Sequence, residues 1–97
     1  MRYRPTDRVA VIATDDRVVL GVLPDGPILV LEDTAAAVWD AVVAMPVEDA
    51  IVHLGDRYGV AAQEIEPHLH RICGELLEAG VLMNDPDAQR RGRAAQG

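Results

Sequence analysis

The sequence has no lysine, no phenylalanine and only one cysteine in its 97 residues. A single cysteine, Cys73, excludes an internal disulfide. The 49% of hydrophobic residues are mainly Ala, Val, Leu and Ile, which favours a compact aliphatic core over an aromatic cage for a ligand. No apolar run approaches the roughly 20 residues that span a bilayer, and the N-terminus lacks the apolar segment of a signal peptide. We therefore expect one globular domain, soluble and cytoplasmic, without membrane contact.

Basic charge is scarce and unevenly placed. The net charge is −7, and residues 32–85 carry eleven acids against Arg57 and Arg71. Nucleic-acid affinity rests largely on basic side chains that displace counterions, so this half should repel phosphate backbones and bind no nucleic acid. Arg90, Arg91 and Arg93 lie in a stretch rich in Gly, Ala and Gln. We predict a folded domain over residues 1–85 and a flexible tail over residues 86–97.

The first third of the chain predicts three strands, over residues 8–14, 17–23 and 28–31, from alternating or β-branched apolar residues. Asp15-Asp16 and Asp25-Gly26 are turn signals, the second because Gly tolerates positive φ. Gly21, inside the second strand, predicts a bulge or a close backbone approach. Pro27 opens the third strand, and because proline cannot donate to a ladder, that strand is expected at a sheet edge.

The rest of the chain predicts three helices. Asp33 or Thr34 is expected to cap the first, which runs to about residue 44 with an apolar stripe at Val38, Trp39, Val42 and Val43. The second spans residues 47–58 and ends at Gly59, with Ile51, Leu54 and Tyr58 on its apolar side. The third spans residues 63–79, with Pro67 in its first turn or at a kink, Gly80 as its cap, and residues 81–83 folding back on the core. Together these elements predict an α+β, winged-helix-like fold, with a three-stranded antiparallel sheet followed by three helices.

No residue pattern predicts catalysis or metal binding. His68 and His70 are two apart and point to different helix faces, and His53 has no paired ligand motif, so no zinc site is expected. Cys73 lies on an apolar helical face, which indicates a buried, inert thiol. The carboxylate pairs Asp15-Asp16 and Glu64-Glu66 are typical of turns and surfaces. We expect no enzymatic activity and no cofactor.

One junction is more specific. Residues 23–43 combine a tight turn, a short apolar strand and an amphipathic helix. The strand ends in Val30, Leu31 and Glu32, and the helix begins with Thr34, Ala35 and Ala36 ahead of Trp39. With Val18 to Leu20, Gly26, Tyr58-Gly59-Val60 and the L-L-E-A-G-V-L run of residues 76–82, this order resembles the PqqD-like family over residues 8–83. The sequence departs from the family at Glu32, where Asn is common, and at Pro27 and Pro67.

The resemblance implies a recognition element for the leader segment of ribosomally synthesised, post-translationally modified peptides, a peptide chaperone of natural-product biosynthesis. The leader would add antiparallel to the third strand and lie against the third helix. A separate peptidase, cyclase or iron–sulfur radical enzyme would then modify the peptide. Arg71, the only basic residue of the third helix, would pair with an acidic leader residue, or else balance Glu75 or Glu78 on a solvated face. Carried onto this chain, the implied peptide-binding residues are Pro27, Ile28, Leu29, Val30, Leu31, His68, Arg71, Ile72, Glu75 and Leu76.

Two other classes of protein fit the same elements. A winged-helix regulator that binds DNA would need a basic recognition helix, whereas residues 61–79 carry four glutamates against Arg71. An interaction module would instead pair its edge strands with a second copy, as a homodimer.

Overall fold

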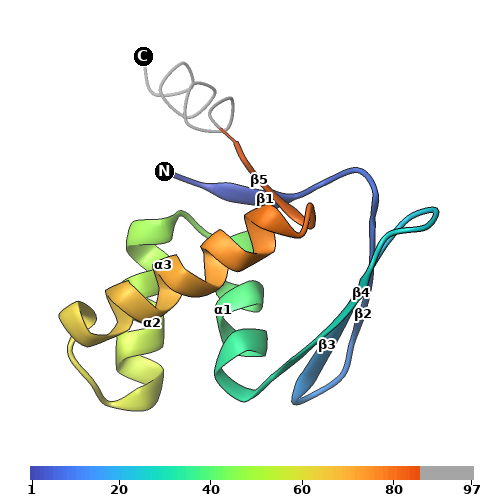
Figure 1. Cartoon of the computed structure of the whole chain (residues 1–97). Coiled ribbons are helices and arrows are strands. Elements are labelled where there is room, and N and C mark those ends of the chain that lie inside the picture. The colour runs from blue at the N-terminus through green and yellow to red at the C-terminus, as the bar shows by residue number, and fades with distance from the viewer. Residues whose placement is uncertain (86–97) are drawn as a thin grey trace.

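The computed structural model describes residues 1–85, and the predicted tail over residues 86–97 lies outside the described residues. Three helices lie on one side of a three-stranded antiparallel sheet (Figure 1), so the predicted α+β fold class is confirmed. The elements, in chain order, are β1 (Tyr3–Pro5), β2 (Val9–Ala13), β3 (Arg17–Val22), β4 (Ile28–Glu32), α1 (Asp33–Ala44), α2 (Val47–Tyr58), α3 (Ala62–Glu78) and β5 (Leu82–Asn84).

The larger sheet has the order β2-β3-β4, so the predicted third strand does lie at an edge. Its register is unbroken: Gly21 pairs with Ala10 on one side and with Ile28 on the other. The bulge predicted at Gly21 is therefore wrong. A Cβ at Gly21 would meet nothing within 4 Å, so no close backbone approach explains this glycine either.

The turn before β4 is present but not for the predicted reason. The Gly26 N–H donates to the Val22 carbonyl at 2.7 Å. Gly26 does not adopt positive φ; among the described glycines only Gly59 and Gly80 do. Its need for glycine is steric, because a Cβ there would lie 2.4 Å from the Val22 Cβ. Here the turn closes on a β-branched side chain that leaves no room for a methyl group.

Helix α1 starts without a side-chain cap. Glu32 occupies the N-cap position and makes no capping hydrogen bond, so the prediction that Asp33 or Thr34 caps the helix is wrong. Asp33 instead takes a left-handed φ of 52°, which turns the chain sharply from β4 into α1. The predicted apolar stripe is correct, since its members are buried or partly buried against the core.

Helices α2 and α3 follow the predicted bounds to within one residue. Gly59 ends α2 in the left-handed conformation, as predicted, with φ of 67°. Tyr58, placed on the apolar side by the sequence, is 43% exposed and lies outside the core. Pro67 lies inside α3, beyond its first turn. No helix of residues 1–85 is both long and apolar enough to cross a membrane.

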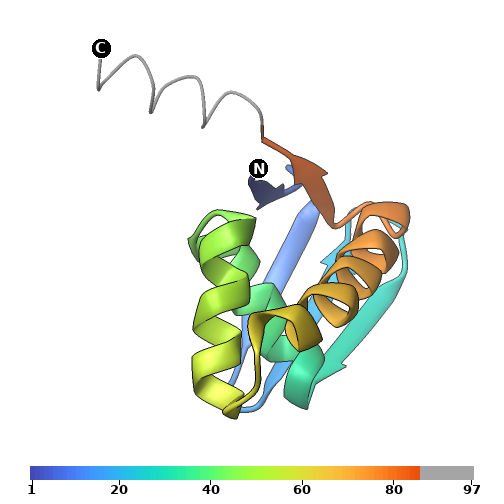
Figure 2. The ribbon, with the colours of Figure 1, turned by 90° about the vertical axis from the view of Figure 1, so that its left-hand side faces the viewer.

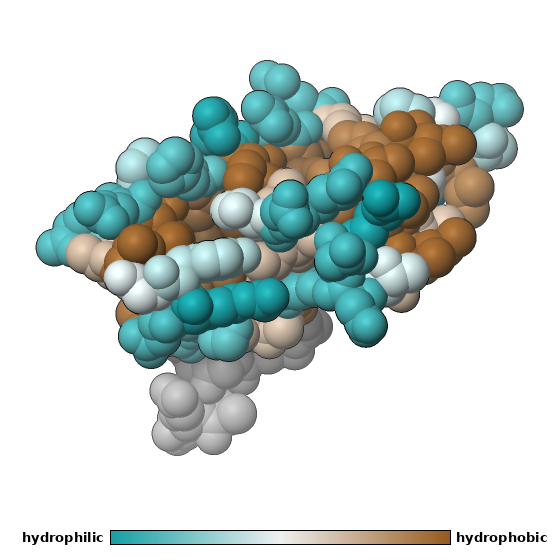
Figure 3. Space-filling model, turned by 90° about the horizontal axis from the view of Figure 1, so that it is seen from below, coloured by the Kyte–Doolittle hydropathy of each residue, from teal (hydrophilic) through white to brown (hydrophobic). Residues whose placement is uncertain are grey.

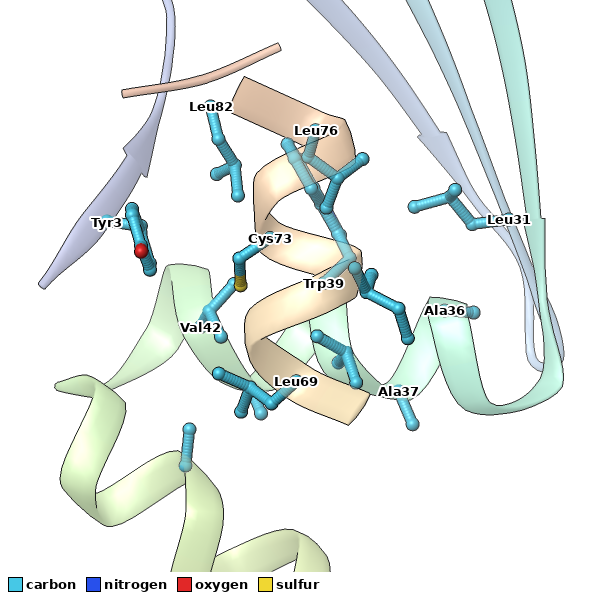
Figure 4. Close-up of a cluster of buried hydrophobic side chains, with 14 of the residues drawn as sticks. Tyr3, Leu31, Ala36, Ala37, Trp39, Val42, Leu69, Cys73, Leu76 and Leu82 are labelled. Atoms are coloured by element: carbon cyan, nitrogen blue, oxygen red, sulfur yellow. The ribbon is translucent and has the colours of Figure 1, made fainter. Parts of the chain in front are cut away.

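The core joins both ends of the described chain. Strand β1 pairs antiparallel with β5, with Tyr3 opposite Asn84, and the sequence pattern did not predict this second sheet. Tyr3 is 4% exposed and packs with the buried side chains of α1 and α3 in Figure 4, which labels Trp39, Val42, Leu69 and Cys73 among them. Val81 and Leu82 are buried, which confirms that residues 81–83 fold back on the core.

The sheet face turned away from the helices is apolar and exposed. Ile12, Val19 and Val30 face one another in one row across the three strands. Ile12 is 66% exposed and Ile28, in the next row, is 75% exposed. Figure 3, a view from below, shows hydrophobic surface gathered at the right, where this sheet stands in Figure 1.

Candidate functional site

Strand β4 presents a backbone edge that no other strand of residues 1–85 pairs with. The Val22 N–H donates to the Pro27 carbonyl at 3.1 Å, so Val22 and Pro27 are a hydrogen-bonded pair. This pair fixes the phase of the β3-β4 ladder, that is, which residue pairs along it are hydrogen-bonded. Because hydrogen-bonded and non-hydrogen-bonded pairs alternate in an antiparallel ladder, Leu29 and Leu31 also direct their backbone groups toward β3. The N–H and C=O groups of Ile28 and Val30 therefore point away from the sheet, at its edge.

The two faces of β4 differ. Leu31 is buried and Leu29 is partly buried against the core, so both face the helices. Ile28 and Val30 face outward, and Glu32 on the same face pairs with Arg17 at 3.6 Å. An extended chain lying along this edge would consequently place alternate side chains toward the helices and toward solvent.

A cleft of about 540 Å³ opens beside the end of β4. In Figure 2, α3 passes in front of the strand that leads into this cleft. The cleft is mainly apolar at its base, where Ile72 and Ile65 are 9% exposed, and polar at its rim. Its walls come from the β4-α1 junction, the end of α2 and one face of α3: Glu32, Asp33, Thr34, Ala35, Tyr58, Ile65, His68, Arg71, Ile72 and Glu75.

Charge around this cleft is mixed. Three acidic residues, Glu32, Asp33 and Glu75, line it together with the basic residue Arg71. Among residues 1–85, no ion pair joins Arg71 to Glu75 or to Glu78. The alternative in which Arg71 only balances Glu75 or Glu78 therefore has no ion pair within the described residues to support it.

The sequence-derived site residues separate into three groups. The helix residues His68, Arg71, Ile72 and Glu75 line the cleft together. The strand residues Pro27, Ile28 and Val30 are exposed, and Leu29 is partly so. Leu31 and Leu76 are 8% and 2% exposed, so their side chains belong to the core.

The sequence reasoning left several cleft residues out of the site. Asp33, Thr34 and Ala35 line it because the sharp turn at Asp33 brings the start of α1 beside α3. Tyr58, expected on the apolar side of the second helix, and Ile65 also line the cleft. The signal in the sequence is the junction after Leu31, because Asp33 and Thr34, predicted there as helix-cap residues, form part of the cleft wall.

Other reactive side chains form no second site. The Cys73 thiol is buried, and its burial raises its pKa to about 11, as an inert thiol requires. His70 approaches Glu66 at 3.7 Å on the solvent side of α3, whereas His68 lines the cleft, so the two histidines do face apart. Within residues 1–85, no group of three His, Cys, Asp or Glu side chains can hold a metal ion.

In this small α+β domain, an open sheet edge of residues 1–85 lies beside a helix-lined cleft, a geometry with which an extended peptide can pair. The family model for coenzyme PQQ synthesis protein D (PqqD) matches residues 17–82, and the chain belongs to this family. The match includes β3, β4 and all three helices, and hence the whole cleft.

A solved structure shares the fold. It is described as TbiB1 in complex with the TbiA(beta) leader peptide, and it superposes with a TM-score of 0.77 at 22% sequence identity. The likeness covers 84% of this chain and 96% of that one. The comparison with curated proteins gives no match.

Proposed function

We propose that this protein binds the leader segment of a precursor peptide and presents the peptide to a separate modifying enzyme. The leader adds as a fourth strand to the free edge of β4, residues Pro27 to Leu31. It lies against the face of α3 that bears His68, Arg71, Ile72 and Glu75. Membership of the PqqD family supports this proposal, as does the fold shared with TbiB1, whose structure contains a leader peptide.

The observation that carries the proposal is the phase of the β3-β4 ladder. Ile28 and Val30 direct unpaired backbone groups along an edge that ends at the cleft. Main-chain hydrogen bonds at such an edge supply affinity without regard to sequence, and pockets for alternate side chains supply specificity. The strand and the cleft are contiguous, so one short extended segment can use both.

The cleft sets the specificity of this site. Leader side chains that face the helices meet the apolar base at Ile65 and Ile72, where an aliphatic or aromatic side chain loses water. Arg71 at the rim pairs with an acidic leader residue. The buried Leu31 and Leu76 support the cleft from beneath and make no direct contact.

Binding without catalysis is the activity that these groups can perform. Backbone amides and an aliphatic helix face hold a peptide but activate neither water nor a nucleophile. The enzyme that acts on the peptide, a peptidase, a cyclase or a radical enzyme, gains from a raised local concentration of its substrate.

A DNA-binding role is disfavoured by the surface of α3. The helix exposes Glu64, Glu66, Glu75 and Glu78 against Arg71, and such a helix would be repelled by phosphates.

Calorimetry with a synthetic leader tests the proposal directly. The neighbouring genes are first searched for a precursor peptide. Its leader is then titrated into the full chain, with a scrambled peptide of the same composition as the control. We expect saturable binding to the leader alone, and a change of mass in the precursor only after a modifying enzyme is added. Binding of both peptides with equal affinity, or cleavage by the purified protein, would contradict it.

A further inference from the structure

Strand β2 forms the opposite edge of the sheet, and no strand of residues 1–85 pairs with its outer side. Natural sheets protect their edges with charge, proline or a bulge. Strand β4 is partly protected in this way, since Pro27 precedes it and the charged pair Arg17–Glu32 lies at its C-terminal end. Between them, the backbone groups of Ile28 and Val30 remain open. Strand β2 reads V-A-V-I-A and has no such protection. Its residues 10–13 are all exposed, Val11 at 44% and Ile12 at 66%, so no helix of residues 1–85 covers these four positions.

The direction of the β2 backbone groups follows from two hydrogen bonds at its ends. The Leu23 N–H donates to the Arg8 carbonyl, and the Thr14 N–H donates to the Arg17 carbonyl, each at 2.8 Å. Even-numbered residues of β2 therefore pair with β3, and odd-numbered residues point outward. Val9, Val11 and Ala13 present the free edge, with the Val9 N–H already donating to Thr6 at 3.4 Å.

This edge is complementary to itself. When a second copy runs antiparallel about a two-fold axis at Val11, the outward-pointing residues face one another, as a hydrogen-bonded ladder requires. Val11 then meets Val11 of the other copy, and Val9 meets Ala13. On the outer face Ile12 meets Ala10, a large side chain opposite a small one.

We propose that two copies of this chain join β2 to β2 about a two-fold axis at Val11, forming one continuous six-stranded sheet. Both backbone bonds of the Val11 pair hold the dimer, together with a bond from each Ala13 N–H to the Val9 carbonyl of the other copy, since the Val9 N–H already donates to Thr6. The apolar rows of the two outer faces merge across it, which removes Ile12 from water. On the helix-facing side, Val11 loses water against Val11 of the other copy. A second copy fits better than an unrelated strand because the two-fold axis places each large side chain other than Val11 opposite a small one: Ile12 faces Ala10, and Val9 faces Ala13.

Charge at the ends of the strand adds a smaller contribution. In this register Arg8 of each copy faces Thr14 of the other, next to the carboxylates of Asp15 and Asp16. Asp7 offsets part of that attraction, so the pairing depends mainly on backbone bonds and apolar contacts.

The dimer leaves the proposed peptide site free, because β2 and β4 lie at opposite edges of the sheet. Each dimer would then offer two leader sites, one at either end of the joined sheet. The dimer itself does not depend on the leader-binding proposal and is tested without a leader peptide.

Light scattering on the full chain over a range of concentrations measures the association. The wild type should rise from 10.5 kDa toward twice that mass. Val11→Lys and Val11→Glu should each stay near the monomer mass, because like charges would meet on the axis. An equimolar mixture of the two variants should regain the dimer mass, since opposite charges then face each other. Val52→Lys, a substitution at another exposed valine, in α2, should dimerise as the wild type does.

A cysteine variant tests the register even if a charge at position 11 disturbs folding. Hydrogen-bonded antiparallel partners have Cα atoms about 5.5 Å apart, within the range that a disulfide spans. Val11→Cys should therefore form a covalent dimer on mild oxidation, while Val52→Cys should not, and the buried Cys73 should not interfere. A wild type that stays monomeric at every concentration would overturn the proposal, as would charge variants that still dimerise or a mixture that fails to associate.

Discussion

Leu29 and Val30 are neighbours in β4 whose backbone groups point in opposite directions. Leu29 pairs with Leu20 of β3, in phase with the Val22–Pro27 hydrogen bond, whereas the Val30 N–H points to the free edge. A change to the Leu29 backbone should therefore affect the stability of the sheet, whereas a change to the Val30 backbone should affect only its capacity to accept another strand.

Substituting proline at Val30 should strongly weaken leader binding while the domain stays folded. The change removes an N–H that no strand of residues 1–85 uses and should weaken calorimetric affinity about tenfold or more, the cost of one lost hydrogen bond at a buried interface. Circular dichroism should remain that of the wild type. Leu29→Pro is the matched control: it removes a ladder donor, so the melting temperature should fall. A folded Val30→Pro protein with wild-type affinity would rule out strand addition.

Reversing the charge at Arg71 should weaken binding of a leader with an acidic residue by about 1–3 kcal/mol, because a charge-assisted hydrogen bond is lost and a third glutamate joins Glu32 and Glu75 at the cleft. Titration calorimetry of Arg71→Glu measures this. Arg4→Glu, in β1 and away from the cleft, makes the same change in net charge and should bind normally. Equal losses in both variants would mean that only the overall charge matters.

Two glycines of the same hairpin should respond oppositely to alanine. A Cβ at Gly26 would lie 2.4 Å from the Val22 Cβ and 2.8 Å from the Val22 carbonyl oxygen, so Gly26→Ala should lower the free energy of unfolding by about 1–3 kcal/mol. Gly21→Ala meets nothing within 4 Å and should leave stability unchanged or raise it by about 0.5–1 kcal/mol. Urea denaturation compares them. A Gly26→Ala protein as stable as the wild type would show that the turn can shift freely.

The buried thiol of Cys73 should make stability depend on alkaline pH. Burial raises its pKa from about 9 to about 11, so the folded state keeps a proton that the unfolded chain releases. This contribution is fully present below pH 9 and is lost as the pH rises through 11. Denaturation between pH 8 and 11 should show the decline, and Cys73→Ala should flatten it. Tyr3, whose pKa is raised by burial and by Cys73, acts in the same direction at higher pH. A Cys73→Ala protein with an unchanged slope would assign the effect to Tyr3.

The elements that local pattern determines were predictable from the sequence. Helical spacing gave α2 and α3 nearly residue by residue, and Gly59 marked the end of α2 because its left-handed φ suits glycine. Pro27 marked β4 as an edge strand because proline lacks the N–H that a central strand must donate. The helix residues of the proposed site follow from the same periodicity, combined with the family resemblance.

Tertiary structure decided what depends on partners distant in the chain. Strands β1 and β5 are three residues each, too short to carry a periodic signal, and they exist because each supplies the other's hydrogen bonds. The cleft forms because the left-handed turn at Asp33 sets α1 against α3, which no local preference of aspartate dictates. Likewise, V-A-V-I-A specifies a strand, but only the packing of the helices left that strand uncovered. Sequence thus determined the local backbone, whose conformation depends on near neighbours, and the assembled fold decided which edges and faces remained open to bind.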